Sequence, residues 1–556
     1  MTQSLRQYVD VRFQDLRSER SSWQSHWKSL SQYIEPRIGR YLTSDTNKGS
    51  VKNGLIINST ATQSLRTLTS GLMTGLTSPS RPWFKLGLAD AELNDVRANR
   101  IWLDSVERVL LAIFRQSNVY QSLISVYEEL GLSGTGSLFV ESDMEKVINT
   151  RVFTVGEYFY ATGSNGRVDT FYREFRKTVK QLVDEFGYEN CAIQTQSLYD
   201  NGRYENWIDI RQAIEPNRQR RDGSYLAKDK KFASYYWESG STETGPNEGF
   251  LRKSGFDDFP IMAPRWDVKS SDVYGRSPAM DILGDVKQLQ SMEKNKGKAI
   301  AKLVDPPMTG DSNITPSQVN VAAGGFTAVK NVGGQKSFVP AYQIDIRINE
   351  LSQDIEKVEQ RIRRGLYEDL FLGISNLDDV RSATEIVERK EEKLLMLGPV
   401  IERIQVELLD TLIERTFNIS MGMGLIPEAP EGLEPHEIEI DYISPLAQAQ
   451  RAVATGTIER LGAYIFNAAQ ANPDVLDKFD FDESVDQYAK ALGSSPKLIK
   501  DKKAVEKTRA IRAEQIQQQQ AQEAAPNMVD SAKKLSEIDP AGNDIINQIL
   551  GSASGQ

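Results

Sequence analysis

The chain has 556 residues, of which 39% are hydrophobic and 26% charged, so we expect several folded modules rather than global disorder. Its net charge of −10 argues against a tight DNA-binding protein, because such proteins present a basic face to the phosphates. One cysteine and two histidines exclude a disulfide framework and a Cys/His zinc site, and we expect neither a signal peptide nor a transmembrane helix.

Four helices are expected in the N-terminal part. Apolar positions that include Trp23 and Trp27 recur at helical spacing through the first 36 residues and stop at Pro36. The other three helices are expected from a cap at Asn58 or Ser59 to the break at Pro79 and Pro82, near 92–116, and over 119–130 with an end at Gly131. Gly71 and Gly75 are spaced for close helix packing.

Short β-type runs follow at 137–142, 151–155 and 157–161. The last of these is joined to 167–175 through Asn165-Gly166, a pair that favours a hairpin turn. Residues 176–187 are helical in pattern. From about 203 to 266 no long amphipathic helix occurs, and the best strands are 206–216 and 231–239, so this stretch is interpreted as a separate small module.

A long helix is expected from the cap Ser277 and the first helical residue Pro278 to 304. The Gly-rich stretch 305–343 indicates a long loop with a strand pair, and a second long amphipathic helix begins near Ile344. A capping box at 382–385 starts another helix, which Gly398-Pro399 should kink. Two or three helices over 445–492 and a solvent-exposed tail from 497 complete the chain.

The sequence offers little enzyme chemistry. Neither Lys298 nor Lys336 has the glycine spacing of a phosphate-binding P-loop. The glycines at 131, 134 and 136 follow a helix and precede a strand, which is the reverse of the order in a dinucleotide site. The acidic residues between 474 and 486 are interpreted as a solvated surface rather than a metal site, because no EF-hand spacing is present.

One basic cluster has two interpretations. Lys294, Lys296, Lys298 and Lys302 gather in the C-terminal half of the helix 277–304, where the helix dipole favours cations. The simplest interpretation is a solvated helix end. The alternative is a set of contacts to passing DNA phosphates, which require only a basic patch.

Four segments, taken together and in order, resemble the head-to-tail connector (portal) protein family of short-tailed bacteriophages. They are SGLMTGLTSPSRPWFKL at 70–86, FPIMAPRW with VYGRSPAMDILGDVKQL at 259–289, SATEIVERKEEKLLMLGPVIERIQVELL at 382–409, and YISPLAQAQR at 442–451. The resemblance covers the chain from about Ser59 to Arg451.

The resemblance implies an α+β, mainly helical portal fold whose subunits form a ring, usually twelve-fold, around a central channel. Its modules would be an N-terminal α/β wing at 1–172, stem helices at 173–202 and 270–304, a strand-rich clip at 203–269, a channel loop with wing strands at 305–343, a long wing helix at 344–398, a helical crown at 399–496 and a tail at 497–556.

The implied function is mechanical: a connector at one capsid vertex through which double-stranded DNA is packaged and ejected. The implied partners are other copies of the chain, the terminase motor, the major capsid and scaffold proteins and tail adaptors, without a membrane, a cofactor, a metal or a catalytic residue. The protein would reside in the virion, and in the host cytoplasm during assembly. The alternatives are a metal-dependent nuclease or terminase-like enzyme, and a helical scaffold protein without a channel.

Overall fold

The chain divides into two compact units, Met1–Ala454 and Thr455–Gln556. A computed structural model describes residues 4–42, 52–90, 96–218, 226–241, 246–304, 308–310, 338–340, 348–375, 397–430, 438–444, 461–470, 472–491 and 505–516, together with single positions between some of these ranges. No helix in these ranges combines the length and the apolar content that crossing a membrane requires. The predicted capping box at 382–385 and the residues after 516 lie outside them.

The N-terminal helices form where the apolar spacing predicts them. They are α1 (Leu5–Tyr33), α2 (Thr60–Leu76), α4 (Arg97–Gln116) and α5 (Val119–Ser133). Ser59 occupies the N-cap position of α2 but makes no side-chain capping bond. The Oδ1 of the preceding Asn58 accepts hydrogen bonds from the backbone nitrogen and the hydroxyl of Thr60. Helix α5 runs past Gly131 and ends before Gly134, which has a φ of 78°.

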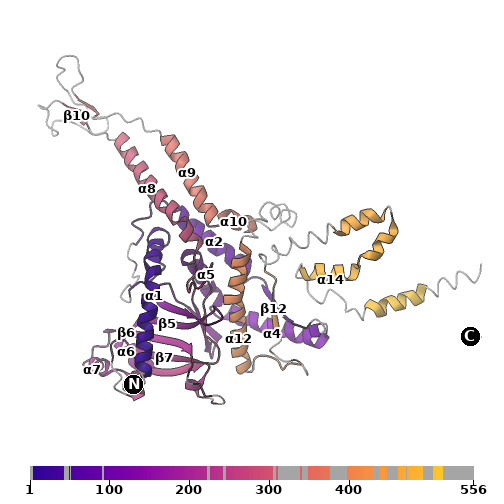
Figure 1. The fold of residues 1–556 in the computed structure, drawn as a ribbon, viewed down its shortest axis with the longest axis horizontal. Coiled ribbons are helices and arrows are strands. Elements are labelled where there is room, and N and C mark those ends of the chain that lie inside the picture. The colour runs from indigo at the N-terminus through magenta and orange to yellow at the C-terminus, as the bar shows by residue number, and fades with distance from the viewer. Residues whose placement is uncertain are drawn as a thin grey trace, which may run out of the picture. The chain divides into compact units, whose positions relative to one another are not determined.

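A five-stranded antiparallel sheet forms the other half of this N-terminal region, in the order β4-β5-β6-β7-β8. Its strands are β4 (Tyr158–Thr162), β5 (Val168–Thr178), β6 (Trp207–Pro216), β7 (Phe232–Glu238) and β8 (Arg252–Phe256). The predicted β4–β5 hairpin is present, with Gly166 at a φ of 73° in its turn. Figure 1 shows α1 running along the sheet, where Val9, Phe13 and Leu16 are buried against side chains of β4 to β7.

This sheet changes two expectations from the sequence. The segment 173–202 is not one helix: β5 continues to Thr178, and only two eight-residue helices follow, α6 (Val179–Phe186) and α7 (Ile193–Asp200). The strands after residue 203 are not a separate sheet either, since β6 pairs with β5 along eight residues from Phe171 to Thr178. Backbone pairing therefore joins regions that composition alone suggested were distinct.

Two smaller sheets contribute buried residues to the main hydrophobic core. Strands β2 (Leu138–Asp143), β3 (Val147–Val152) and β9 (Ile261–Met262) form one of them. Strand β1 (Phe84–Leu88) pairs with β12 (Ile438–Tyr442), a strand that the sequence did not predict. This antiparallel pairing sets Phe84 opposite Tyr442 and Leu88 opposite Ile438, and so joins segments that are remote in the sequence.

Two long helices lie side by side (Figure 1). They are α8 (Pro278–Val304), which Ser277 caps through the backbone nitrogen of Met280, and α9 (Ile348–Gly365). The short strands β10 (Met308–Gly310) and β11 (Phe338–Pro340) pair between them in sequence, as expected. The second predicted long helix is broken, because Tyr367 adopts a φ of 56° and a separate α10 (Glu368–Ser375) follows.

The helix over 397–422 contains an irregularity that the sequence did not predict. Residues Gln405–Asp410 are π-helical, and α12 (Thr411–Gly422) continues from them. Within this segment, the carboxylate of Glu407 pairs with the buried guanidinium of Arg265 at 2.5 Å and accepts the backbone N–H of Arg265 at 2.9 Å. A π segment alters the phase of a helix, and here it coincides with a buried ion pair to a distant loop.

The second unit is helical in its described part. It contains a helix at 461–469, a 3₁₀ turn at Pro473–Lys478, α14 (Phe481–Ala491) and a helix at 505–516. The guanidinium of Arg509 makes paired hydrogen bonds to the carboxylate of Asp482 at 2.6 and 2.7 Å. The helix at 505–516 is exposed along almost its whole length, as the sequence predicts for the start of the tail.

Gly71, the first glycine of the pair on α2, provides the close packing that the spacing predicts, whereas a Cβ at Gly75 would make only ordinary contacts. A Cβ atom at Gly71 would lie 2.2 Å from the ring of Phe371, which is buried on α10. We expect Gly71→Ala to lower the free energy of unfolding by about 1–3 kcal/mol, because the close-packed helices must separate. Urea unfolding followed by circular dichroism measures this change.

Gly284→Ala on α8 is the matched control for Gly71→Ala. No atom lies within 4 Å of a Cβ at Gly284, so this change should raise stability by up to about 1 kcal/mol through helix propensity alone. Equal effects of the two substitutions would contradict the packing argument.

A buried acid on α5 makes stability depend on pH. Glu129 accepts a hydrogen bond from the backbone nitrogen of Val155 at 3.3 Å, and burial raises its pKa to about 8. The folded chain therefore retains a proton that the unfolded chain releases near the ordinary carboxyl pKa. Stability is lost as the pH rises between these values.

We expect Glu129→Gln to remove this dependence, because the amide keeps the acceptor oxygen without titrating. The wild-type free energy of unfolding should fall by up to about 1.4 kcal/mol for each pH unit between about 5 and 8, relative to the variant. Urea unfolding of both proteins across this range measures the difference. Parallel pH profiles would show that Glu129 is ionised in the folded chain.

Candidate DNA-contact site

The candidate lysines lie on the part of α8 that leaves the core. The buried side chains of this helix run from Pro278 to Gln290, and none occurs from residue 291 to 304. Beyond the buried part, the helix exposes Ile300, Leu303 and Val304, which are 40%, 46% and 80% exposed. Within the part of the chain that the structure describes, the C-terminal half of α8 is thus exposed rather than packed into the core.

The structure separates the four candidates into two sets. Lys294, Lys298 and Lys302 recur every four residues, so they share one face of α8, and all three are exposed. These three residues are termed the lysine face. Lys296 lies two residues from Lys294, on the opposite side, and is half-buried. The sequence therefore grouped one lysine with a face to which it does not belong, and the assignment of the other three to DNA contact stays a prediction.

Sequence reasoning missed a lysine that extends the lysine face toward the core. Lys287 lies seven residues before Lys294, a spacing that returns to the same side of a helix. Its ammonium lies 3.5 Å from the hydroxyl of Ser29 and 5.3 Å from the ring centre of Tyr33, both on α1. The seven-residue spacing from Lys294 could have identified Lys287 from the sequence.

Several polar groups of α8 are engaged with other elements. Asp285 accepts two hydrogen bonds from Arg361 of α9, at 2.9 and 3.0 Å. Glu293 accepts one from the side-chain amide of Asn58 at 3.1 Å, and Gln290 accepts the backbone N–H of Asn58 at 2.8 Å. These two carboxylates of α8 are therefore held by partners away from the lysine face.

The described residues do not offer a metal centre. They contain no group of three or more His, Cys, Asp or Glu side chains placed to hold an ion. Asp474, Asp480 and Asp482 are exposed, and Asp482 is paired with Arg509. The geometry at α8 thus supports charge contact with a passing polyanion, which requires exposed cations and no fixed catalytic group.

Comparison with known proteins identifies the class to which the chain belongs. The model of the family described as bacteriophage head to tail connecting protein matches residues 6–499. The portal protein of Salmonella phage epsilon15 is 39% identical over 540 residues, which cover 97% of this chain and 96% of that protein. The probable portal protein of Bordetella phage BPP-1 is 40% identical over 556 residues, which cover 100% and 99%.

The chain therefore belongs to the bacteriophage head-to-tail connecting protein family. Its function is that of a portal, which confirms the resemblance seen in the sequence, and the relatives give no support to a nuclease, a terminase or a scaffold protein. Among solved structures, a chain of a native gene transfer agent virion aligns over 84% of this chain and 99% of its own length, at 11% identity and a TM-score of 0.34.

Proposed function

We propose that copies of this chain form a ring, twelve-fold as in the resembling family, around a channel at one vertex of the capsid. Double-stranded DNA would enter and leave through this channel. The observation that carries the proposal is the match to portal proteins along the full length of the chain. The ring would dock the terminase during packaging and tail adaptors afterwards, and it would contact capsid and scaffold proteins while it assembles in the host cytoplasm.

The helix pair α8–α9 supports a revised arrangement of modules. Ile282 lies against Gly365 and Asp285 against Arg361, so the two helices are antiparallel. Between them in sequence lie the paired strands β10 and β11. A stem pair that flanks a strand-bearing clip is what the family resemblance implies, and α8 with α9 fits this description better than the segment 173–202 does. The clip would then include β10 and β11.

The five-stranded sheet would belong to the wing in this arrangement. Its strands β4 and β5 come largely from the stretch expected as wing, and β6 to β8 come from the stretch expected as clip. One continuous sheet favours placing both in a single body. The helices after about residue 399 remain our proposal for the crown.

Charge supports a translocation channel rather than a tight DNA-binding site. Twelve copies at −10 each give −120, so a ring would repel DNA on average. Against this background, the lysine face of α8 would supply weak, exchanging contacts with phosphates. Low affinity allows the duplex to slide, and energy for transport would come from a separate ATP-hydrolysing motor, with this chain acting as a structural part and not as an enzyme.

Ring formation is tested by the mass of the purified protein. We expect light scattering to give a species near twelve times 62.4 kDa, and negative-stain images of the same peak to show rings with a central hole. Because assembly of such rings can require scaffold protein, the measurement is repeated after coexpression with it. A monomer or dimer under both conditions would contradict the proposal.

The lysine face is tested by comparing two substitutions. Lys294, Lys298 and Lys302 changed together to Ala should leave ring assembly intact. The plot of log affinity for DNA against log salt concentration should become shallower by about 0.9 for each phosphate that the lysines no longer neutralise. Packaging and retention of DNA should change in parallel. Lys296→Ala is the control, since this lysine lies on the other side of α8. Normal DNA association by the triple variant would exclude the lysine face as a DNA-binding surface.

A further inference from the structure

The five-stranded sheet has a basic end. The sequence 217–231, which connects β6 to β7, contains six basic and two acidic residues in a chain of net charge −10. Four of the exposed basic side chains here, together with Leu226, are termed the basic knob. Its members are Arg218, Arg221, Leu226, Lys228 and Lys231.

Two acids near the basic knob are already engaged. Asp229 is buried and accepts a hydrogen bond from the hydroxyl of Ser224 at 2.6 Å. Asp257 pairs with Lys230, which is not a member of the knob, at 2.6 Å. Leu226 lies within this basic stretch with 58% of its area exposed, although it is a large apolar side chain. Leu226 thus adds an apolar group to a surface that is otherwise cationic, and a mixed apolar and charged surface is usual in protein–protein interfaces.

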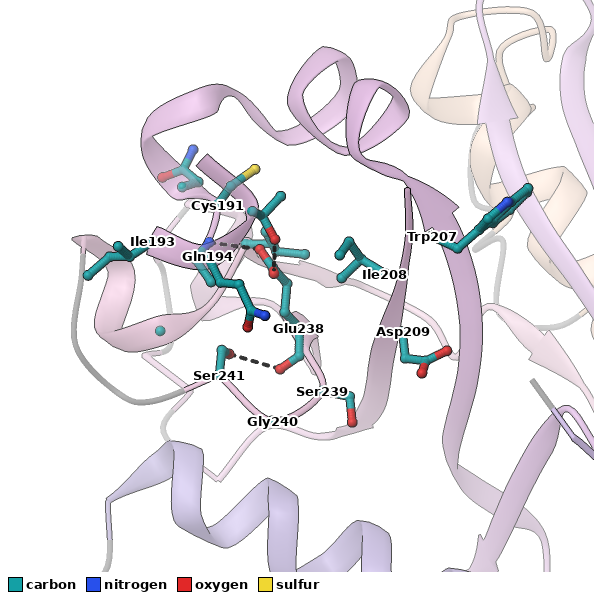
Figure 2. Close-up of a pocket in the computed structure, with 15 residues that line it drawn as sticks. Cys191, Ile193, Gln194, Trp207, Ile208, Asp209, Glu238, Ser239, Gly240 and Ser241 are labelled. Carbon is teal, nitrogen blue, oxygen red and sulfur yellow. Dashed lines mark hydrogen bonds between the residues drawn. The ribbon is translucent and has the colours of Figure 1, made fainter. Parts of the chain in front are cut away.

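At the other end of strands β6 and β7 lies a cavity of about 370 Å³, termed here the Trp207 cavity. It is lined by the start of β6, the end of β7 and the segment 190–195 at the start of α7. Figure 2 shows Trp207 and Ile193 on opposite sides of the cavity, with Glu238 between them. Trp207 and Ile193 are 54% and 74% exposed, so they form an uncovered apolar rim.

The Trp207 cavity is acidic. Its lining contains Glu238 and Asp209 and no Lys or Arg. The carboxylate of Glu238 is held in place by the backbone nitrogen of Ala192 at 2.7 Å and the hydroxyl of Thr195 at 2.5 Å, and Asp209 pairs with Arg176 at 2.6 Å. The sequence 188–209 around it contains four acidic residues and one basic residue. Arg176 and the buried Arg6, which donates to the backbone oxygen of Glu238 at 3.1 Å, offset part of this charge. With these two cations and Glu238 included, five acidic residues stand against three basic ones, so the surroundings of the cavity remain net negative.

A chain cannot fill the Trp207 cavity with its own basic knob. Strand β6 has ten residues, from Trp207 beside the cavity to Pro216 beside the knob. At roughly 3.3 Å per residue these ends lie about 30 Å apart. Any contact between the two surfaces must therefore involve two copies of the chain.

We propose that the basic knob of one copy docks into the Trp207 cavity of the next copy. This inference rests on the proposed ring, because a ring requires each copy to meet its neighbours through two different, complementary surfaces. Leu226 would cover the rim formed by Trp207 and Ile193, and the surrounding Arg and Lys side chains would face the carboxylates and the indole ring. Opposite charge would orient the copies as they meet.

Disulfide trapping tests this contact directly. The single native cysteine is first removed by Cys191→Ser, and Ile193→Cys and Leu226→Cys are then introduced together, both at exposed positions. A disulfide requires Cα atoms within about 7 Å, which the two positions of one copy cannot meet. After mild oxidation of assembled rings, a non-reducing gel should show a ladder of multimers that extends to the covalently closed ring.

Each single cysteine variant is the matched control and should give no ladder. Rings of normal mass that yield no ladder in the double variant would overturn the docking contact and leave the ring proposal intact. Absence of rings in the wild-type protein, by contrast, would count against the proposed function itself.

Charge-reversal variants distinguish whether the basic knob contacts a neighbouring copy of the chain or DNA. Arg221→Glu with Lys228→Glu should make rings dissociate at lower salt and lower temperature, and Trp207→Ala should have the same effect from the other surface. Far-ultraviolet circular dichroism of each variant monitors its folding. Rings of unchanged stability that lose only salt-dependent DNA association would assign the basic knob to DNA and overturn the proposal.

Discussion

Burial of one side of α8 is the constraint on which much of the structure depends. Its apolar positions from Ala279 to Leu289 are buried against the core, and Gln290 ends this stretch with hydrogen bonds to the segment that precedes α2. The buried stretch fixes the rotation of the whole helix, because an α-helix is rigid over this length. The direction of the later side chains, including the lysine face, is therefore set by packing that lies up to about 20 Å away, at ~1.5 Å per residue.

The sheet depends on a comparable anchor at the N-terminus. The guanidinium of Arg6 is buried and donates hydrogen bonds to the backbone oxygens of Gly249 at 2.6 Å and Glu238 at 3.1 Å. These bonds tie α1 to the loop that follows β7, which is also the loop beside the Trp207 cavity. A buried cation bound to carbonyl oxygens is stable only where its donors are satisfied, so the end of β7 is held in one position.

Local pattern predicted the helices and most strands well, and it failed where the outcome depends on distant partners. The cap at Ser277 is decided by neighbouring residues and was found from the sequence. Strand β12 gains its order by pairing with β1, which is remote in sequence, so its own residues gave no clear signal. The π segment at Glu407 likewise coincides with the pairing to Arg265, and the break at Tyr367 interrupts an apolar spacing that continues past it. The candidate lysines were recognised by composition, but their separation into two faces needed the helix phase.

Charged residues are unevenly distributed over this protein, and the net charge alone does not reveal this. The average of −10 per copy disfavours strong DNA binding, yet basic residues are concentrated on the C-terminal half of α8 and in the connection between β6 and β7. The first set repeats along one regular helical face, which suits a mobile polyanion. The second surrounds Leu226 and is matched by an acidic, aromatic-rimmed cavity on the same sheet, which suits a fixed protein contact. In our proposals, similar charge would therefore serve sliding in one place and assembly in the other, with the presence of a complementary surface deciding between them.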